Sequence, residues 1–363
     1  GYSSYNSWVG TISPRLGNPF GLGAPLKATV TYGGNIHDYE ATLRIPKWLL
    51  PLGGAQADLT GGYLNQITPA FGPLTTESIT LGTTWITVHQ RVGASPASTW
   101  SLGLHYDYRL RTRNLDALRA IGTDLDETQV AVSTQTGSIG ATLDIDHRID
   151  RNGNLSPLAA ENGYHLFANV AYAMPDRVPL IGGQDSFIKV STSASYFHLF
   201  GGKSGNLVVR ADFHYDEGFP LGGAALLPDV ERFFAGGDNT VRGYEDDRLA
   251  TEVIRVPVPP IGGSLTQIRV IPAGGNIRVM SSLDAQYRIW SVFAAALFTD
   301  AGMIANDWRL VTADDIRPSA GMGLRALTPF GIVALEYAVP INPHLGDDPR
   351  GRYHFYFAAR ATF

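Results

Sequence analysis

A glycine-rich segment in the second half of the chain carries residue types suited to a buried ionic contact. It reads Phe-Phe-Ala-Gly-Gly-Asp-Asn-Thr-Val-Arg-Gly-Tyr from Phe233 to Tyr244, and its glycines permit tight backbone turns. Arg242 is a fixed positive charge flanked by Val241 and Gly243. In an exposed loop this arginine would simply be solvated. In an enclosed position it would need an anionic partner, because a buried unpaired charge is very costly.

Acidic residues in later segments could supply that partner. The sequence Phe-Thr-Asp-Ala-Gly at 298–302 places Asp300 on the inward face of an alternating segment, above small residues that leave room for an inserted loop. Asp284 and Glu336 face inward by the same alternation. The predicted contact joins the loop residues Val241, Arg242, Gly243 and Tyr244 to Asp300, Phe298, Gly302, Glu336 and Asp284.

Three other patterns could carry chemistry, and none is complete. The run 201–204, Gly-Gly-Lys-Ser, lacks the earlier glycine of a phosphate-binding loop, because Phe197 stands there. Residues 150–154 begin like a calcium loop, but Leu155 replaces the required glycine. No G-x-S-x-G nucleophile motif occurs. We therefore expect no catalytic residue, no metal site and no cofactor, although a triad assembled from separate strands stays open as an alternative.

Composition excludes further classes of protein. The chain has no cysteine, which rules out disulfide scaffolds and thiolate sites. Its net charge of −5, with scattered Lys and Arg, argues against nucleic-acid binding. No apolar run reaches the roughly 18 residues of a membrane-spanning helix. Charged residues make up only 17%, against about 25% in an ordinary soluble domain.

Alternation with a period of two residues is the dominant signal along the chain. Apolar and polar residues alternate over 98–110, 206–215, 277–288 and 352–363. These segments are longer than the usual strand of about five or six residues. A soluble β-sandwich is one alternative. A transmembrane barrel fits better, because the polar face carries both signs of charge and the apolar face ends in Tyr and Trp, as in membrane-interface girdles.

Sixteen segments qualify as strands, and an even number lets an antiparallel barrel close. The sequence thus predicts an all-β fold, a 16-stranded antiparallel transmembrane β-barrel in which residues 1–363 form one domain. A connection of unusual length, about 216–276, is expected to fold into the lumen. The predicted strands are 7–15, 25–33, 36–46, 54–63, 77–90, 98–110, 127–136, 139–148, 163–174, 187–199, 206–215, 277–288, 290–301, 317–327, 332–339 and 352–363.

These features resemble the outer-membrane protein-85 superfamily. The Val-Arg-Gly-Tyr motif at 241–244, in a long loop before the twelfth strand, is similar to the family's loop signature. The motif at 298–302 is similar to its inward-facing acidic motif in the thirteenth strand. The run 323–325, Gly-Leu-Arg, also fits the family pattern, and Phe363 resembles the terminal aromatic residue of outer-membrane barrels. The loop segment is most similar to the BamA and TamA branch, and two-partner-secretion transporters are more distant.

The resemblance implies a location in the bacterial outer membrane and a mechanism without bond chemistry, so that the chain is not an enzyme. Its partners would be outer-membrane lipids, unfolded polypeptide clients and accessory lipoproteins or periplasmic proteins, with no nucleic acid. The barrel would insert or export polypeptides. Family members carry periplasmic POTRA domains before the barrel, and we expect such an upstream domain to lie outside this chain.

The resemblance also implies a weak seam between the first and last strands. The expected seam residues are Val9, Gly10 and Phe363, and Pro14 removes a ladder hydrogen bond near the end of the first strand. Such a seam would open sideways and offer an edge to a client strand. A ragged terminus is the plainer interpretation. Two functional alternatives stay open: a two-partner-secretion transporter, and a barrel that anchors or exports a fused patatin-like hydrolase.

Overall fold

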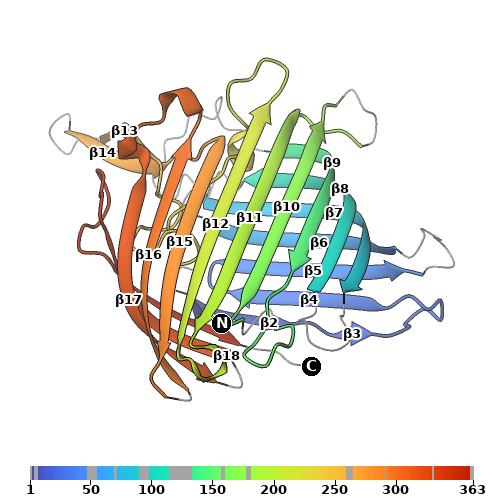
Figure 1. Ribbon diagram of the computed structural model, residues 1–363. Coiled ribbons are helices and arrows are strands. Elements are labelled where there is room, and N and C mark those ends of the chain that lie inside the picture. The colour runs from blue at the N-terminus through green and yellow to red at the C-terminus, as the bar shows by residue number, and fades with distance from the viewer. Residues whose placement is uncertain are drawn as a thin grey trace.

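Antiparallel strands form the wall of a barrel, and most of them follow one another around it in chain order (Figure 1). In this computed structural model the described residues are 2–3, 7–46, 55–68, 72–89, 98–113, 133–156, 160–176, 181–258, 265–290, 292–328 and 331–359. The first part of the wall contains β1 (Tyr2–Ser3), β2 (Ser7–Ile12), β3 (Arg15–Leu16), β4 (Leu26–Gly33), β5 (Ile36–Ile45), β6 (Gln56–Thr68), β7 (Gly72–His89), β8 (Ser98–Arg113) and β9 (Ser133–Asp146). The second part contains β10 (Gly163–Met174), β11 (Phe187–Phe200), β12 (Leu207–Pro220), β15 (Ile277–Arg288), β16 (Phe293–Ala305), β17 (Arg317–Thr328), β18 (Gly331–Pro340) and β19 (Arg352–Ala359).

The wall closes on itself through a strand of two residues, β1. β1 pairs antiparallel with β2 on one side and with β19 on the other. Within the described residues, seventeen strands belong to the sheet, and β2 and β3 form one broken wall strand because both pair with β4. The wall therefore has sixteen positions, which confirms the predicted antiparallel barrel.

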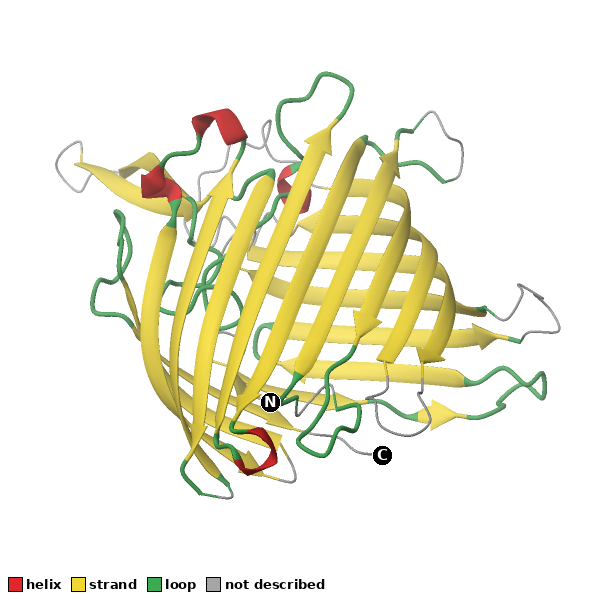
Figure 2. Cartoon of the chain, in the orientation of Figure 1, coloured by secondary structure: helices red, strands yellow, loops and turns green. Residues whose placement is uncertain are grey.

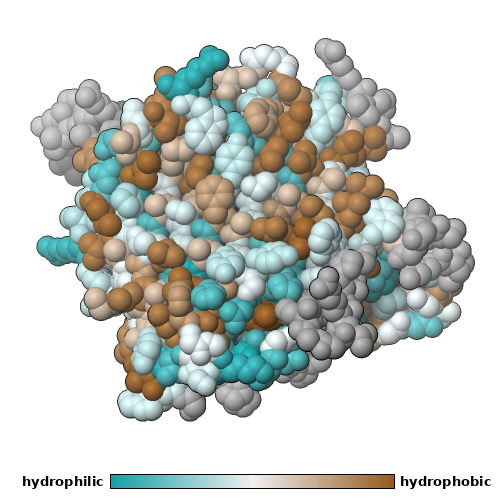
Figure 3. All heavy atoms as spheres, viewed as in Figure 1, coloured by the Kyte–Doolittle hydropathy of each residue, from teal (hydrophilic) through white to brown (hydrophobic). Residues whose placement is uncertain are grey.

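The two faces of the wall differ in polarity as a membrane barrel requires. Leu102 and Leu104 of β8 are exposed on the outside, whereas Thr136 and Ser138 of β9 are buried. Apolar side chains are spread over the outer wall in the space-filling view (Figure 3). The described helices are 3-10 turns of three residues in the connections (Figure 2), so none of them has the length of a membrane span.

One region of the wall corrects the predicted strands. Residues 133–146 form a single strand, β9, where the sequence suggested strands at 127–136 and 139–148. A Cβ atom at Gly137 would lie 1.9 Å from the carbonyl oxygen of Ile181, and one at Gly140 would lie 2.6 Å from the ring of His105. These glycines therefore allow close approach within a continuous strand. Residues 127–132 lie outside the described part of the chain.

The N-terminal edge strand of the wall is β1, which lies nearer the N-terminus than the first strand that the sequence predicts, 7–15. Val9 and Gly10 belong to β2 and pair with Gly33 and Tyr32 of β4, so β1 separates them from β19. The physical reason is length, because two residues are too few to show an alternating pattern. Phe363 lies outside the described residues.

The connection after β12 contains structure of its own. It holds a 3-10 turn, η2 (Asp229–Glu231), and a hairpin of β13 (Thr251–Val258) and β14 (Leu265–Pro272), which pairs with no wall strand among the described residues. Figure 1 shows this hairpin projecting beyond the wall at the upper left. The part of the connection before the hairpin runs inside the barrel, as the contacts below establish.

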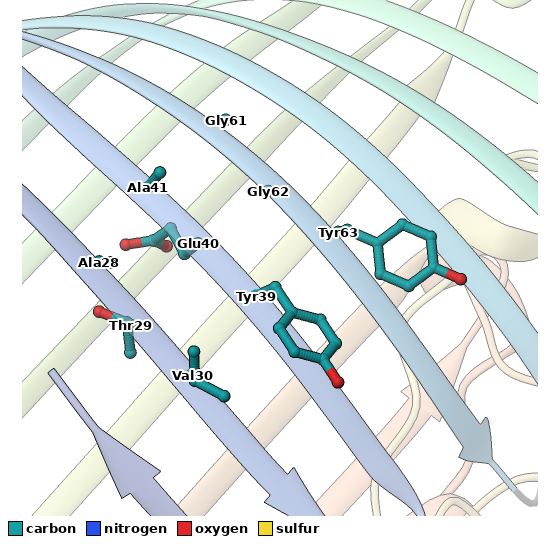
Figure 4. Close-up of a pocket in the computed structure, with 9 residues that line it drawn as sticks. All are labelled: Ala28, Thr29, Val30, Tyr39, Glu40, Ala41, Gly61, Gly62 and Tyr63. Atoms are coloured by element: carbon teal, nitrogen blue, oxygen red, sulfur yellow. The ribbon is translucent and has the colours of Figure 1, made fainter.

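Small residues make a shallow hollow in the outer wall. Ala28, Ala41 and Gly61 are successive register partners across β4, β5 and β6. The rings of Tyr39 and Tyr63 lie beside them, with centroids 6.3 Å apart (Figure 4). Because both tyrosines are exposed, the hollow opens to the outer face of the barrel rather than to the lumen.

Candidate functional site

The loop before β13 is held inside the lumen by an apolar cluster. Val241, Tyr244 and Leu249 of the loop are almost fully buried, and they pack with Met280 of β15 and Ile304 of β16. Met280 lies in the first strand after the long connection, and Ile304 lies in the strand that pairs with it. The cluster therefore fixes the loop motif against the strands that carry the predicted acidic partners.

Arg242 is bound to Asp300 by three hydrogen bonds. Its Nε and Nη2 donate to the two carboxylate oxygens at 2.8 Å each, and its backbone N–H donates to Oδ2 at 3.1 Å. The hydroxyl of Ser282, the register partner of Asp300, donates to Oδ1 at 2.7 Å. The Asp300 side chain is 1% exposed, so this is a bidentate ion pair shielded from solvent.

A second arginine completes the charge network. Arg242 Nη1 donates to Glu336 Oε2 at 2.8 Å and lies 3.7 Å from Asp284. Arg325 of β17 bridges the same two carboxylates, with Nε 2.8 Å from Glu336 Oε1 and Nη1 2.8 Å from Asp284 Oδ1. Two cations thus face three carboxylates, and all of the acidic residues singled out in the sequence lie together.

An aromatic ring supports the network from the wall. The guanidinium carbon of Arg242 lies 3.4 Å from the centroid of the Phe298 ring, a cation–π arrangement. Gly321, the register partner of Phe298, gives the ring its space, because a Cβ atom there would lie 2.3 Å from the ring. Gly321 is a site residue that the sequence analysis did not single out.

The glycines of both motifs serve close packing. A Cβ atom at Gly302 would lie 2.6 Å from Val241 Cγ2 and 2.7 Å from Leu249 Cδ2. Gly243 has a φ of +94°, and a Cβ atom there would lie 3.3 Å from the backbone of β18. Only glycine meets both demands at position 243. The loop is therefore pressed against β16 and β18 at once.

Tyr244 anchors the end of the motif. Its hydroxyl lies 2.9 Å from the carbonyl oxygen of Pro318 and 3.3 Å from that of Asn342. The guanidinium of Arg317 lies 4.7 Å from the centre of its ring. The ring is 1% exposed, so the tyrosine joins the loop to both β17 and the β18–β19 connection.

The electrostatics keep Arg242 charged. Burial alone would lower the pKa of its guanidinium, but hydrogen bonds and the negative charges of Asp300 and Glu336 raise that pKa above its ordinary value. A permanent charge in a shielded network is a structural tie, since it neither exchanges protons nor acts as a nucleophile. Among the described residues, no group of His, Asp and Glu is arranged to hold a metal ion.

A second ionic contact, which the sequence did not lead us to predict, holds the start of the loop to another part of the barrel wall. Glu231 of η2 is 2% exposed. Its carboxylate accepts hydrogen bonds from Lys189 Nζ of β11 at 3.0 Å and from Arg111 of β8. Burial alone would raise the pKa of Glu231, but the charges of Lys189, Arg111 and Arg109 lower it to about 2.

The sequence did contain a signal for this second tie. Arg109, Arg111 and Arg113 alternate on one face of β8, and three like charges on one face require anionic partners. Arg113 meets Asp229 of the same loop at 2.6 Å. The loop therefore bridges the lumen between β8 and β11 on one side and β16 to β18 on the other.

Comparison with known proteins agrees with this architecture. The Omp85 superfamily domain matches residues 18–363. The structure of BamA from Haemophilus ducreyi lacking POTRA domains 1–3 has a TM-score of 0.67 with 16% sequence identity, and the match covers 99% of this chain and 69% of that one.

Two CdiB structures are also similar. CdiB from Escherichia coli has a TM-score of 0.58 at 15% identity, and the match covers 98% of this chain and 60% of that one. CdiB from Acinetobacter baumannii has a TM-score of 0.54 at 12% identity, covering 97% and 57%. The chain thus spans 57% to 69% of the length of these structures. At such identities the likeness concerns the fold.

Proposed function

The chain belongs to the Omp85 superfamily and is a bacterial outer-membrane β-barrel, and we propose that it inserts or exports polypeptides through a seam between β1 and β19. Unfolded polypeptides are the clients, and accessory lipoproteins or periplasmic proteins assist. The described residues carry out no bond chemistry in this proposal. Strand pairing and client folding provide the driving force.

The observation that carries the proposal is the inequality of the two edges of β19. On one side β19 pairs with β18 in eight register pairs, from Gly331–Ala359 to Ala338–Arg352. On the other side the described residues give one register pair, Tyr2–Phe357. An edge with few ladder hydrogen bonds is a site where a client strand can add by β-augmentation.

The doubly tied loop favours this lateral route over a central pore. Moving the loop out of the lumen would break the Arg242 network and the Glu231 network, each of which is a set of shielded ion pairs. Opening the seam leaves both networks in place. The lateral route therefore disturbs fewer buried charges.

Two-partner secretion is the second candidate. The likeness to CdiB barrels and the polar lumenal side of the wall favour it, for example the Thr80–Asp107 hydrogen bond of 2.7 Å between β7 and β8. In that case a single exported partner would pass through the lumen after displacement of the loop. A fused patatin-like hydrolase is a further alternative, and none of the described residues supports it.

A cross-link across the seam tests the proposal. The chain has no cysteine, so Tyr2→Cys and Phe357→Cys introduce a single pair. The double variant is placed in liposomes, and insertion of a urea-denatured eight-stranded outer-membrane barrel is followed by gel mobility. Oxidation should stop insertion and reduction should restore it, while each single variant stays active. Equal insertion by the oxidised and reduced forms would refute a lateral route.

A further inference from the structure

A buried histidine on the last wall strand contacts the loop at two points. His354 of β19 is 1% exposed. Its Nδ1 is hydrogen-bonded to the carboxylate of Asp238 in the loop. Its Nε2 accepts a hydrogen bond from the backbone N–H of Gly243 at 3.2 Å. The imidazole therefore closes the segment 238–243, which contains Arg242, onto the strand that borders the seam.

The two contacts define the tautomer of the ring. A backbone N–H can only donate, so Nε2 must carry the free lone pair. Nδ1 then carries the proton and donates a hydrogen bond to the Asp238 carboxylate. The neutral ring thus uses both nitrogens, and neither contact can be replaced by a simple aliphatic side chain.

Further charges surround this histidine and reinforce the same junction. Glu336, the register partner of His354 on β18, accepts from Arg242. Arg352, two residues before His354 on the same strand, pairs with Glu245 of the loop at 2.8 Å. Asp246 also lies close: burial, followed by the charges of Asp238 and Asp247, raises its pKa to about 6. The loop therefore contacts two residues of β19 that face the same side of the strand, Arg352 and His354.

We propose that His354 is a positioning residue that ties the loop to the seam strand, so that β19 leaves β1 only when the Asp238–His354–Gly243 contact is released. The Arg242 network stays in place during that step, because its acidic partners lie on β15, β16 and β18. The inference rests on the proposed function and adds the group through which the loop controls the seam.

Hydrogen exchange of the wall strands tests this inference without any client. Exchange of β19 amides reports how often that strand opens. His354→Ala should raise the exchange rate of residues 352–359 about tenfold, roughly the loss expected for one or two buried hydrogen bonds. Exchange in β6, on the far wall, should not change.

Conservative variants distinguish the loss of the His354 hydrogen bonds from the loss of its side-chain volume. His354→Gln places an acceptor near the Nε2 position and should keep the Gly243 contact, whereas His354→Asn should keep only the Asp238 contact. Both should lie between the wild type and His354→Ala. The matched control is His165→Ala on β10, which removes a histidine–carboxylate contact of 2.9 Å with Asp144 that involves no loop residue. It should leave β19 exchange unchanged.

The contradicting results are specific. Unchanged β19 exchange in His354→Ala, or an equal rise in every strand, would overturn the inference. If that variant does not fold, Asp238→Ala removes the acceptor of the same contact from the loop side and must give the same local rise. Normal seam-dependent insertion with unchanged exchange would overturn this inference alone. Local exchange as predicted, with insertion indifferent to the seam cross-link, would overturn only the proposed function.

Discussion

At the scale of single residues, Arg242 combines functions that a lysine could not. Its planar guanidinium binds Asp300 through two nitrogens, reaches Glu336 with a third and stacks on Phe298. The partners were predictable, because alternation fixes which carboxylates face inward and burial requires an arginine to be paired. Glu231 was harder to predict, because nothing near it in the sequence marks the segment as buried.

We expect Arg242 and Asp300 to be energetically coupled. Arg242→Ala should lower the unfolding free energy by about 3–5 kcal/mol, because it leaves the buried carboxylate of Asp300 without its cation. The double variant with Asp300→Ala should lose clearly less than the sum of the two single losses. Urea unfolding in detergent, followed by tryptophan fluorescence, measures all four proteins.

The control for this double-mutant cycle is an exposed ion pair. Arg44 lies 3.0 Å from Asp58, with side chains 49% and 30% exposed. Arg44→Ala should cost less than about 1 kcal/mol. Strictly additive losses for Arg242 and Asp300 would contradict a direct tie between the loop and β16.

Glu231 should make the barrel sensitive to acid. Its pKa falls from 4.5 to about 2 on folding, so its carboxylate stabilises the barrel fully above pH 4.5. That contribution is lost as the pH drops from 4.5 toward 2, where the folded form also takes up the proton. The urea midpoints of wild type and Glu231→Gln should therefore differ most at pH 7 and converge near pH 2. A difference that is independent of pH would contradict the assigned pairing.

At the scale of elements, glycines allow the loop to pack closely against the wall. Gly302→Ala should displace the loop, because its Cβ atom would meet Val241 and Leu249 at 2.6–2.7 Å. Overpacking of this kind costs about 1–3 kcal/mol. Gly61→Ala is the matched control, since a Cβ atom at that strand position meets nothing within 4 Å. Limited proteolysis of the loop together with urea midpoints should distinguish the two variants. Equal behaviour would argue against close packing at Gly302.

The elements also show what alternation can and cannot reveal. Long strands such as β8 and β12 were predicted from period-two patterns, because lipid and lumen impose opposite polarities on successive residues. β1 escaped notice because it has two residues. β9 was divided in two although its glycines accommodate Ile181 and His105 from other segments. The contact of Asp238 with His354, 116 positions apart, depends on how the loop folds back, which no local pattern specifies.

At the scale of the whole molecule, the proposed function depends on the two ties that hold the loop and on the short pairing of β1 with β19. The loop is fixed to β8 and β11 through Glu231 and to β15, β16 and β18 through Arg242. Both ties leave β1 untouched. Under the proposed function, β19 therefore separates from β1 while the loop stays in the lumen.

The lateral route is tested most directly by mapping which barrel residues a client contacts during insertion. A photoreactive amino acid is introduced at Tyr2 of β1 or at Thr80 on the lumenal face of β7, and a urea-denatured eight-stranded outer-membrane barrel serves as the client. Leu81, exposed on the outer face of β7, is the control position. Client adducts are expected at position 2, and none above the control level at position 80. Adducts at position 80 without adducts at position 2 would contradict the lateral route.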